Sequence, residues 1–227
     1  RMLEHAQRWN SMTPEQRNKQ EWLASLADLE PDLVINTGDN LAHRDSVPHV
    51  IEALAPLLQR PGAYVLGSND YFAPTMRNPL AYLTPDRGQR HTRAPQLPWP
   101  KLKADLSSGG WLDLTNGFGE LTVKGTQIAF VGVDDPHLAY DDLERVSGRA
   151  YAGADVRLAV VHAPYLRVLD PFARAGYDAI IAGHTHGGQV CLPTLGGRGR
   201  ALTTNCDLEP ARAKGLHRHP AASQPED

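Results

Sequence analysis

The chain has 227 residues, a formal net charge of −3 at pH 7 and a hydrophobic content of 41%. These values fit one globular domain over residues 1–227 and argue against a broad nucleic-acid-binding surface. Two cysteines do not predict a disulfide scaffold. The sequence has no run of about 18 apolar residues, so no membrane span is predicted, and its amino terminus lacks the apolar core of a secretory signal.

The amino-terminal half predicts a helix followed by a strand–helix–strand unit. Thr13 is the expected N-cap of the first helix, with Gln16 closing a capping box. An apolar stripe at helical spacing is expected to lie in the core: Trp22, Leu23, Leu26 and Leu29. Residues 32–36 and 63–66 then form apolar strands, separated by a helix over residues 46–59. The polar, proline-rich stretch 78–100 is predicted to be an insertion loop over the site.

The carboxyl-terminal half predicts a second sheet. Residues 111–114, 120–123 and 127–132 are expected to form an antiparallel meander, followed by a strand at 156–161, a helix at 166–175 and a strand at 179–182. Asp134, Asp135 and His137 are interpreted as a solvated turn rather than as ligands, since no glycine-bearing buried strand frames them. Residues 207–227 are predicted to be a flexible tail.

Potential metal ligands directly follow four of the predicted strands. They are Asp39, Asn69, His162, His184 and His186. Imidazole, carboxylate and amide oxygen groups are common metal ligands, and loops at the carboxyl ends of strands gather such groups around one site. Taken singly, each has an ordinary explanation as a cap, a turn residue or a core histidine. Taken together, they predict a metal centre.

The ordered motifs Gly38-Asp39, Gly67-Ser68-Asn69-Asp70, His162 and Gly183-His184-Thr185-His186 resemble the calcineurin-like metallophosphoesterase superfamily. The run Gly-His-Thr-His-Gly-Gly-Gln resembles its bacterial branch. The resemblance implies an α/β fold in which a two-layer β-sandwich is flanked by helices in four layers, α/β/β/α. It also implies two divalent ions, Mn, Fe or Zn, that activate a hydroxide to hydrolyse phosphate mono- or diesters.

The resemblance assigns roles by position. Asp39 would bridge the two ions, His162 and His184 would bind one ion, and His186 would bind the other. Asn69 would serve as an amide ligand. Asp70 is expected to orient a ligating histidine from outside the coordination sphere, because such histidines usually donate their other ring nitrogen to a carboxylate or carbonyl.

Two departures from the family pattern bear on activity. No Asp-x-His motif precedes Asp39, so the ion near His186 is short of ligands, and residues 1–12 are interpreted as a non-native-looking leader. Ser68 and Asn69 stand where the family has asparagine and a proton-donating histidine. Losing that acid predicts a rate penalty on the order of 10²- to 10⁴-fold. We also expect the first strand and the closing carboxyl-terminal strands to be missing.

Three interpretations stay open. The chain is an active phosphoesterase on a small or lipid-linked phosphate ester, or an inactive relative that holds one metal ion or none and serves as a binding module. A zinc hydrolase of the metallo-β-lactamase type is less consistent, since Gly187 and Gly188 stand where that class continues with Asp-His. The expected location is the cytoplasm or a membrane surface, the latter through a segment absent from this chain.

Overall fold

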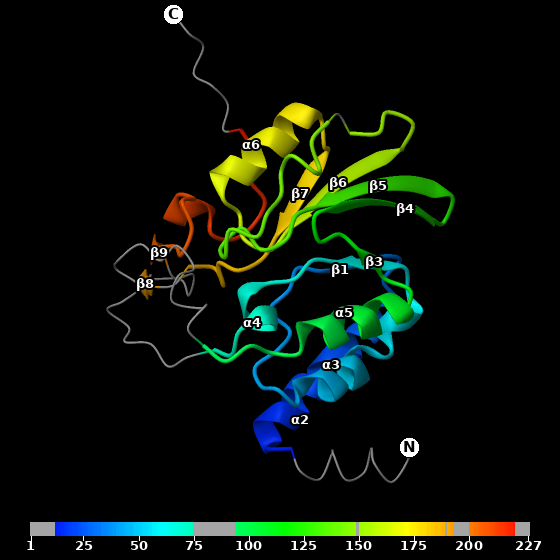
Figure 1. Cartoon of the computed structure of the whole chain (residues 1–227), viewed down its shortest axis with the longest axis vertical. Coiled ribbons are helices and arrows are strands. Elements are labelled where there is room, and N and C mark those ends of the chain that lie inside the picture. The colour runs from blue at the N-terminus through cyan, green and yellow to red at the C-terminus, as the bar shows by residue number, and fades with distance from the viewer. Residues whose placement is uncertain (1–11, 75–93, 149, 189, 193–199, 221–227) are drawn as a thin grey trace, which may run out of the picture.

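The computed structural model describes residues 12–74, 94–148, 150–188, 190–192 and 200–220. Two β-sheets lie face to face (Figure 1). Helices α2 (Pro14–Ser25), α3 (Ser46–Leu54) and α5 (Trp99–Ser108) lie on one outer side, and α6 (Leu166–Ala175) lies on the other. This is the predicted α/β/β/α order. The predicted leader lies almost wholly outside the described residues, as does most of the predicted insertion loop.

The first sheet has three parallel strands in the order β1 (Val34–Asn36), β2 (Gly62–Tyr64) and β3 (Leu112–Asp113). Helix α3 (Ser46–Leu54) connects β1 to β2, and α5 (Trp99–Ser108) precedes β3. The predicted placement of residues 111–114 in an antiparallel meander is therefore wrong. A crossover through α5 brings β3 back parallel to β2, and this helix, which begins at the end of the proline-rich stretch, was not predicted.

The second sheet has the order β4 (Gly117–Val123), β5 (Thr126–Gly132), β6 (Val156–Val161) and β7 (Ala179–Ala182). Strands β4 and β5 form the predicted antiparallel hairpin, whose turn residues Lys124 and Gly125 both have positive φ. Strands β5, β6 and β7 are parallel, and α6 (Leu166–Ala175) crosses from β6 to β7. The carboxyl ends of these three strands consequently share one edge.

Three hydrophobic clusters fill the spaces between the layers. On β2, Tyr64 faces the helices α3 and α5, whereas Ala63 points between the two sheets with Phe130 and Val160. The third cluster joins the second sheet to α6 through residues such as Phe172. The period-2 alternation of side chains along β2 thus separates two cores and fixes the face that each sheet presents.

The first helix and its extension only partly match the predicted apolar stripe. Leu23 and Leu26 of α2 (Pro14–Ser25) and η1 (Leu26–Leu29) pack against the core, but Trp22 is 62% exposed and Leu29 is 76% exposed. The chain changes from α to 3₁₀ geometry at Leu26, which breaks the 3.6-residue period that placed Leu29 on the stripe. Trp22 instead lines a cavity beside β1.

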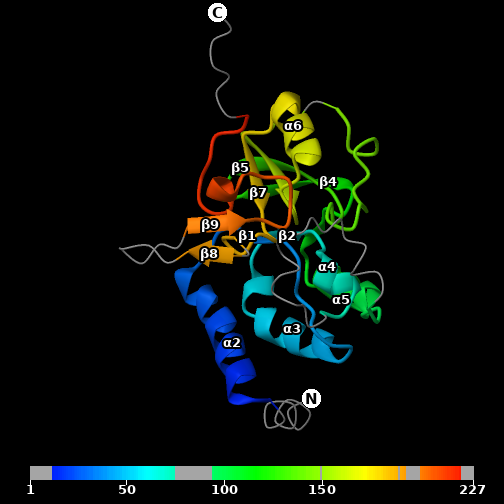
Figure 2. The same cartoon turned by 90° about the vertical axis from the view of Figure 1, so that its left-hand side faces the viewer.

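The chain continues beyond the histidine motif into a further antiparallel pair, β8 (Val190–Leu192) and β9 (Arg200–Thr203), and then η5 (Pro210–Arg212). Figure 2 views the molecule from the side on which this pair lies. Closing strands were predicted to be missing here. Within the region predicted as a tail, Leu208 and Ala213 are buried, and residues 221–227 lie outside the described part. The remaining helices are η2 (Leu57–Gln59) and α4 (Ser68–Tyr71).

Candidate metal centre

Two glycines allow the loops after β1 and β2 to touch. A Cβ at Gly38 would lie 2.4 Å from the backbone nitrogen of Gly67, and Gly38 has φ of +91°, which favours glycine. A Cβ at Gly67 would lie 2.4 Å from the ring of His162 and 2.6 Å from Asp39 Oδ1. The glycines of the Gly-Asp and Gly-Ser-Asn-Asp motifs therefore provide the close approach that the site needs.

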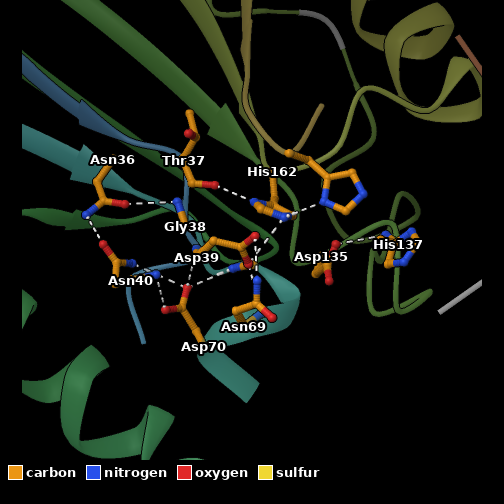
Figure 3. A network of polar contacts seen from close by, with 12 residues as sticks. Asn36, Thr37, Gly38, Asp39, Asn40, Asn69, Asp70, Asp135, His137 and His162 are labelled. Atoms are coloured by element: carbon orange, nitrogen blue, oxygen red, sulfur yellow. Dashed lines mark hydrogen bonds and ion pairs between the residues drawn. The ribbon is translucent and has the colours of Figure 1, made fainter. Parts of the chain in front are cut away.

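Three potential ligand atoms converge at this point (Figure 3). Nε2 of His162 lies 3.0 Å from Nδ1 of His184 and 3.5 Å from Oδ1 of Asp39. Asp39, His162 and His184 form a group whose ligand atoms all lie within 4.8 Å of one another. The two histidines are buried, and the Asp39 side chain is 16% exposed. The structure thus brings together three of the five predicted ligands, and we call them the donor group.

The donor group has the chemistry that a divalent cation requires. Nδ1 of His162 lies 2.6 Å from the carbonyl oxygen of Thr37. Because a carbonyl can only accept, Nδ1 carries the proton, and the ring in its neutral form presents the lone pair of Nε2 to the group. A carboxylate oxygen and two imidazole nitrogens that face one another suit Zn, Mn or Fe. The residues present therefore fit a metal ion.

Asn69 and Asp70 lie beside the donor group but do different things. Asn69 donates its backbone N–H to Asp39 Oδ1 at 2.8 Å and its Nδ2 to Asp39 Oδ2 at 3.1 Å. Asp70, which is fully buried, accepts from the backbone N–H groups of Gly67, Asp39 and Asn40. Asp70 thus holds the Asp39 loop and not the ring of His162. Nδ1 of His162, for which a carboxylate or carbonyl partner was expected, is hydrogen-bonded to the carbonyl oxygen of Thr37.

Left-handed backbone conformations mark the residues of the predicted site. Asp39 has φ of 62°, His184 has φ of 66° and His186 has φ of 51°. Such values cost about 1–3 kcal/mol for a residue with a side chain and persist where surrounding contacts enforce them. Thr185, between the two histidines, is held by a hydrogen bond from its hydroxyl to the carbonyl of Ala213 at 2.7 Å. The carboxyl-terminal segment therefore fixes the histidine loop.

His186 lies apart from the donor group. It is exposed and, with Asp39, lines a cavity of about 1220 Å³ that extends along β1 toward Trp22 and Trp111. In the part of the chain that the structure describes, no second set of three acidic, histidine or cysteine ligands surrounds His186. Its predicted role as a ligand of a second ion stays a prediction.

Buried carboxylates give this region an unusual electrostatic balance. Burial raises the pKa of Asp70 to about 6, against the lowering effect of its backbone hydrogen bonds. Burial likewise raises the pKa of Asp135 to about 6. For His162, burial lowers the pKa, but the carboxylates of Asp39 and Asp135 outweigh it and the net shift is upward. Negative charge thus accumulates in a dry region, which favours a bound cation.

The turn of residues 134–137 was interpreted as solvated, and that interpretation is wrong. Asp135 is 0% exposed and His137 is 2% exposed, and the His137 ring lies 4.6 Å from the His184 ring. The turn follows β5, whose carboxyl end shares an edge with β6 and β7. Because β5 was predicted only as a meander strand, its end was not expected at the site. Thr37 was missed too, since only its backbone acts.

Comparison with known proteins agrees with this geometry. A family model for calcineurin-like phosphoesterases matches residues 14–188. The chain belongs to this family. The predicted fold and the predicted family membership are thereby confirmed, and the metallo-β-lactamase interpretation is set aside. The uncharacterized metallophosphoesterase YkuE of Bacillus subtilis (strain 168) is 26% identical over 181 residues, covering 77% of this chain and 54% of the relative. The chain spans about half the length of that relative.

Among the described residues, none of the helices combines the length and the apolar character that crossing a membrane requires.

Proposed function

We propose that this chain hydrolyses phosphate mono- or diesters in a metal-dependent reaction. The observation that carries the proposal is the donor group of Asp39, His162 and His184, whose ligand atoms lie within 4.8 Å of one another. It is formed by loops after β1, β6 and β7, so the convergence is a property of the fold. The substrate class that this supports is a phosphate ester, small or lipid-linked.

The chain's own residues hold and orient. Asp39 contributes the anionic oxygen, and Asn69 fixes both oxygens of that carboxylate through hydrogen bonds. Thr37 fixes the ring of His162. Divalent ions bound there would polarise the phosphate oxygens and lower the pKa of a bound water toward neutrality. His186, on the cavity wall next to Asp39, is proposed as a ligand of a second ion.

Asn69 has a consequence for the leaving group. An asparagine at this position cannot give a proton to a departing alkoxide at neutral pH. Esters with acidic leaving groups, such as aryl phosphates, need no such proton, whereas alkyl esters do. We therefore expect aryl esters to be hydrolysed faster than alkyl esters by about 10²-fold or more, the size of one general-acid contribution.

The test is a set of hydrolysis assays on the full chain with aryl and alkyl phosphate esters. The assays are run with Mn²⁺, with Zn²⁺ and after chelation. Hydrolysis that disappears on chelation and in Asp39→Asn supports the proposal, with Asp45→Asn, an exposed carboxylate, as the matched control. Metal-independent hydrolysis, or equal rates in Asp39→Asn and Asp45→Asn, would contradict it.

A second candidate is a binding module that holds one ion or none without turnover. It is favoured by the absence, among the described residues, of a second group of three acidic, histidine or cysteine ligands around His186 that would hold a second ion. Elemental analysis separates the two. About two ions per chain with turnover supports the enzyme, and one tightly bound ion without turnover supports the module.

A further inference from the structure

Asp135 carries a buried carboxylate oxygen that makes no well-formed hydrogen bond with the protein. The residue follows β5 and is 0% exposed. Its Oδ1 accepts a hydrogen bond from the backbone N–H of His137 at 2.8 Å, whereas its Oδ2 is buried and accepts no hydrogen bond of normal geometry. A buried acceptor left in this state destabilises the folded chain, and a charged one does so more strongly. Such an atom is a candidate for contact with a bound ligand.

The neighbouring carboxylate shows that the turn itself does not need this oxygen. Asp134 accepts from the Tyr71 hydroxyl on both of its oxygens, at 2.8 and 2.7 Å, and also from the backbone N–H of Asp135. Asp134 therefore ties the turn to α4. Two adjacent aspartates share one turn, but only Asp134 has both oxygens satisfied by the protein.

A second buried polar atom lies near Asp135. The hydroxyl of Ser68 is 1% exposed and close enough to favour the ionised form of Asp135, yet neither Ser68 Oγ nor Asp135 Oδ2 has a partner of normal hydrogen-bond geometry. One water molecule between a hydroxyl and a carboxylate satisfies both groups. Ser68 directly precedes Asn69, whose hydrogen bonds reach Asp39. The two atoms thus border the donor group.

Asp135 lies outside the donor group. It is not among the residues whose ligand atoms lie within 4.8 Å of one another, so it does not reach an ion bound by all three. Asp135 is still near, since the positive charge of His162 lowers the pKa of Asp135 against the raising effect of burial. Figure 3 shows it between His137 and the side of the site that carries His162 and Asn69.

The turn that carries Asp135 is fixed firmly against the donor group. Nδ1 of His137 lies 2.9 Å from the Tyr165 hydroxyl, and Arg167 donates to the Pro136 carbonyl at 2.7 Å. The ring of His137 packs against that of His184. Residues that orient the coordination sphere of a metal from outside are held in this manner.

We propose that Asp135 is a positioning residue of the metal centre, whose Oδ2 holds, together with the Ser68 hydroxyl, a water molecule that is also a ligand of the ion. The inference rests on the proposed function and adds a residue that contacts the ion indirectly, through a hydrogen-bonded water molecule. Asp135 thereby positions a water ligand, which would add to the three ligands of the donor group. The serine that replaces the family's asparagine makes this arrangement possible, because its short side chain leaves the water in contact with both groups.

The experiment compares Asp135→Asn and Ser68→Ala with Asp134→Asn as the matched control. Asparagine keeps an acceptor for the His137 N–H, so the turn is retained while the charge is lost. Affinity for Co²⁺ is measured by calorimetry, the visible spectrum of the Co²⁺ protein reports its ligands, and thermal unfolding is measured without metal. Ser68→Ala tests the same water without changing charge and decides the question should Asp135→Asn fail to fold.

We expect Asp135→Asn to bind Co²⁺ about 10- to 100-fold more weakly, the usual effect of an outer partner, and to change the Co²⁺ spectrum. Its metal-free unfolding temperature stays unchanged or rises, because an unsatisfied charge is removed. Ser68→Ala shows a smaller loss of affinity in the same direction. Asp134→Asn shows a lower unfolding temperature, with affinity within about threefold of the parent chain.

Two results would overturn the inference, and a third separates it from the proposed function. Parent-like Co²⁺ affinity and spectrum in both Asp135→Asn and Ser68→Ala would show that no shared water ligand exists. An equal loss of affinity in Asp134→Asn would show that the turn, not the oxygen, matters. If the parent chain itself does not bind Co²⁺, the metal centre fails and the inference fails with it.

Discussion

His184 and His186 are two residues apart in one loop, yet they lie in opposite surroundings. His184 is 8% exposed, lies 3.0 Å from His162 and packs against His137. His186 is exposed and borders a cavity along the edge strand β1. Both have left-handed backbone conformations, so the backbone conformation does not distinguish them. One motif thus serves two regions that differ in burial and in the number of neighbouring ligands.

The histidine motif alone does not form both halves of a metal centre. On the His184 side, Asp39 and His162 come from other strands, and Thr37, Asp70 and the 134–137 turn hold them in place. On the His186 side, Asp39 and His49 are the other acidic or histidine residues among the described residues that line the same cavity, and no second group of three ligands forms there. We therefore expect the His184 side to bind its ion tightly and to tolerate little change.

The largest predicted effect tests this difference directly. His162→Ala removes a buried ligand and should weaken metal binding by more than the roughly 100-fold that outer partners contribute. His186→Ala should change the affinity for the first ion by less than about tenfold, because its ring is outside the donor group. Competition with a chromophoric chelator measures both values.

An exposed histidine, His43, provides the control, since its side chain pairs weakly with Asp45 at the surface. His43→Ala should bind metal like the parent chain. Similar losses in His162→Ala and His186→Ala would break the comparison, because they would place both histidines around the first ion.

A smaller effect sharpens the comparison through the support that lies behind Asp39. Asp70 accepts three backbone N–H groups, and Asp70→Asn replaces one of its acceptors with a donor. At least one of those N–H groups then loses its partner, which predicts a loss of about 2–3 kcal/mol in the free energy of unfolding. Chemical denaturation measures this value. Asp105→Asn, which breaks one i,i+4 pair with Lys101, should cost about 0.5 kcal/mol or less. A parent-like stability in Asp70→Asn would remove Asp70 from this supporting role.

The sequence predicted strand ends better than it predicted which ends meet. Asp39, His162 and His184 were found because each follows an apolar run, and those runs are β1, β6 and β7. Asp135 and His137 follow a run of the same kind, β5, but only its antiparallel partner β4 was predicted and its parallel partner β6 was not. Parallel pairing of β5 with β6 depends on long-range contacts, which local patterns do not encode. The same limit hid the crossover through α5 and the exposure of Trp22.

The smallest predicted effect concerns pH and distinguishes the metal-free protein from the loaded one. Asp70 and Asp135 have a folded-state pKa of about 6, above the ordinary value of 3.8. The folded protein therefore binds more protons than the unfolded chain between these values, so the stability of the metal-free protein falls as pH rises from about 4 to 6. The raised pKa of His162 acts in the same direction, since its contribution is lost as pH rises through its folded-state value.

We expect the decline to be on the order of 1 kcal/mol for each carboxylate, less than the full linkage value because metal-free groups relax. A bound divalent ion stabilises the ionised carboxylates and should flatten or reverse this slope. Thermal unfolding at pH 4.5 and 7, with and without Mn²⁺, measures the change. A metal-free protein that is more stable at the higher pH would show that these carboxylates are already neutralised by the protein, which removes the electrostatic reason for placing the ion on the His184 side.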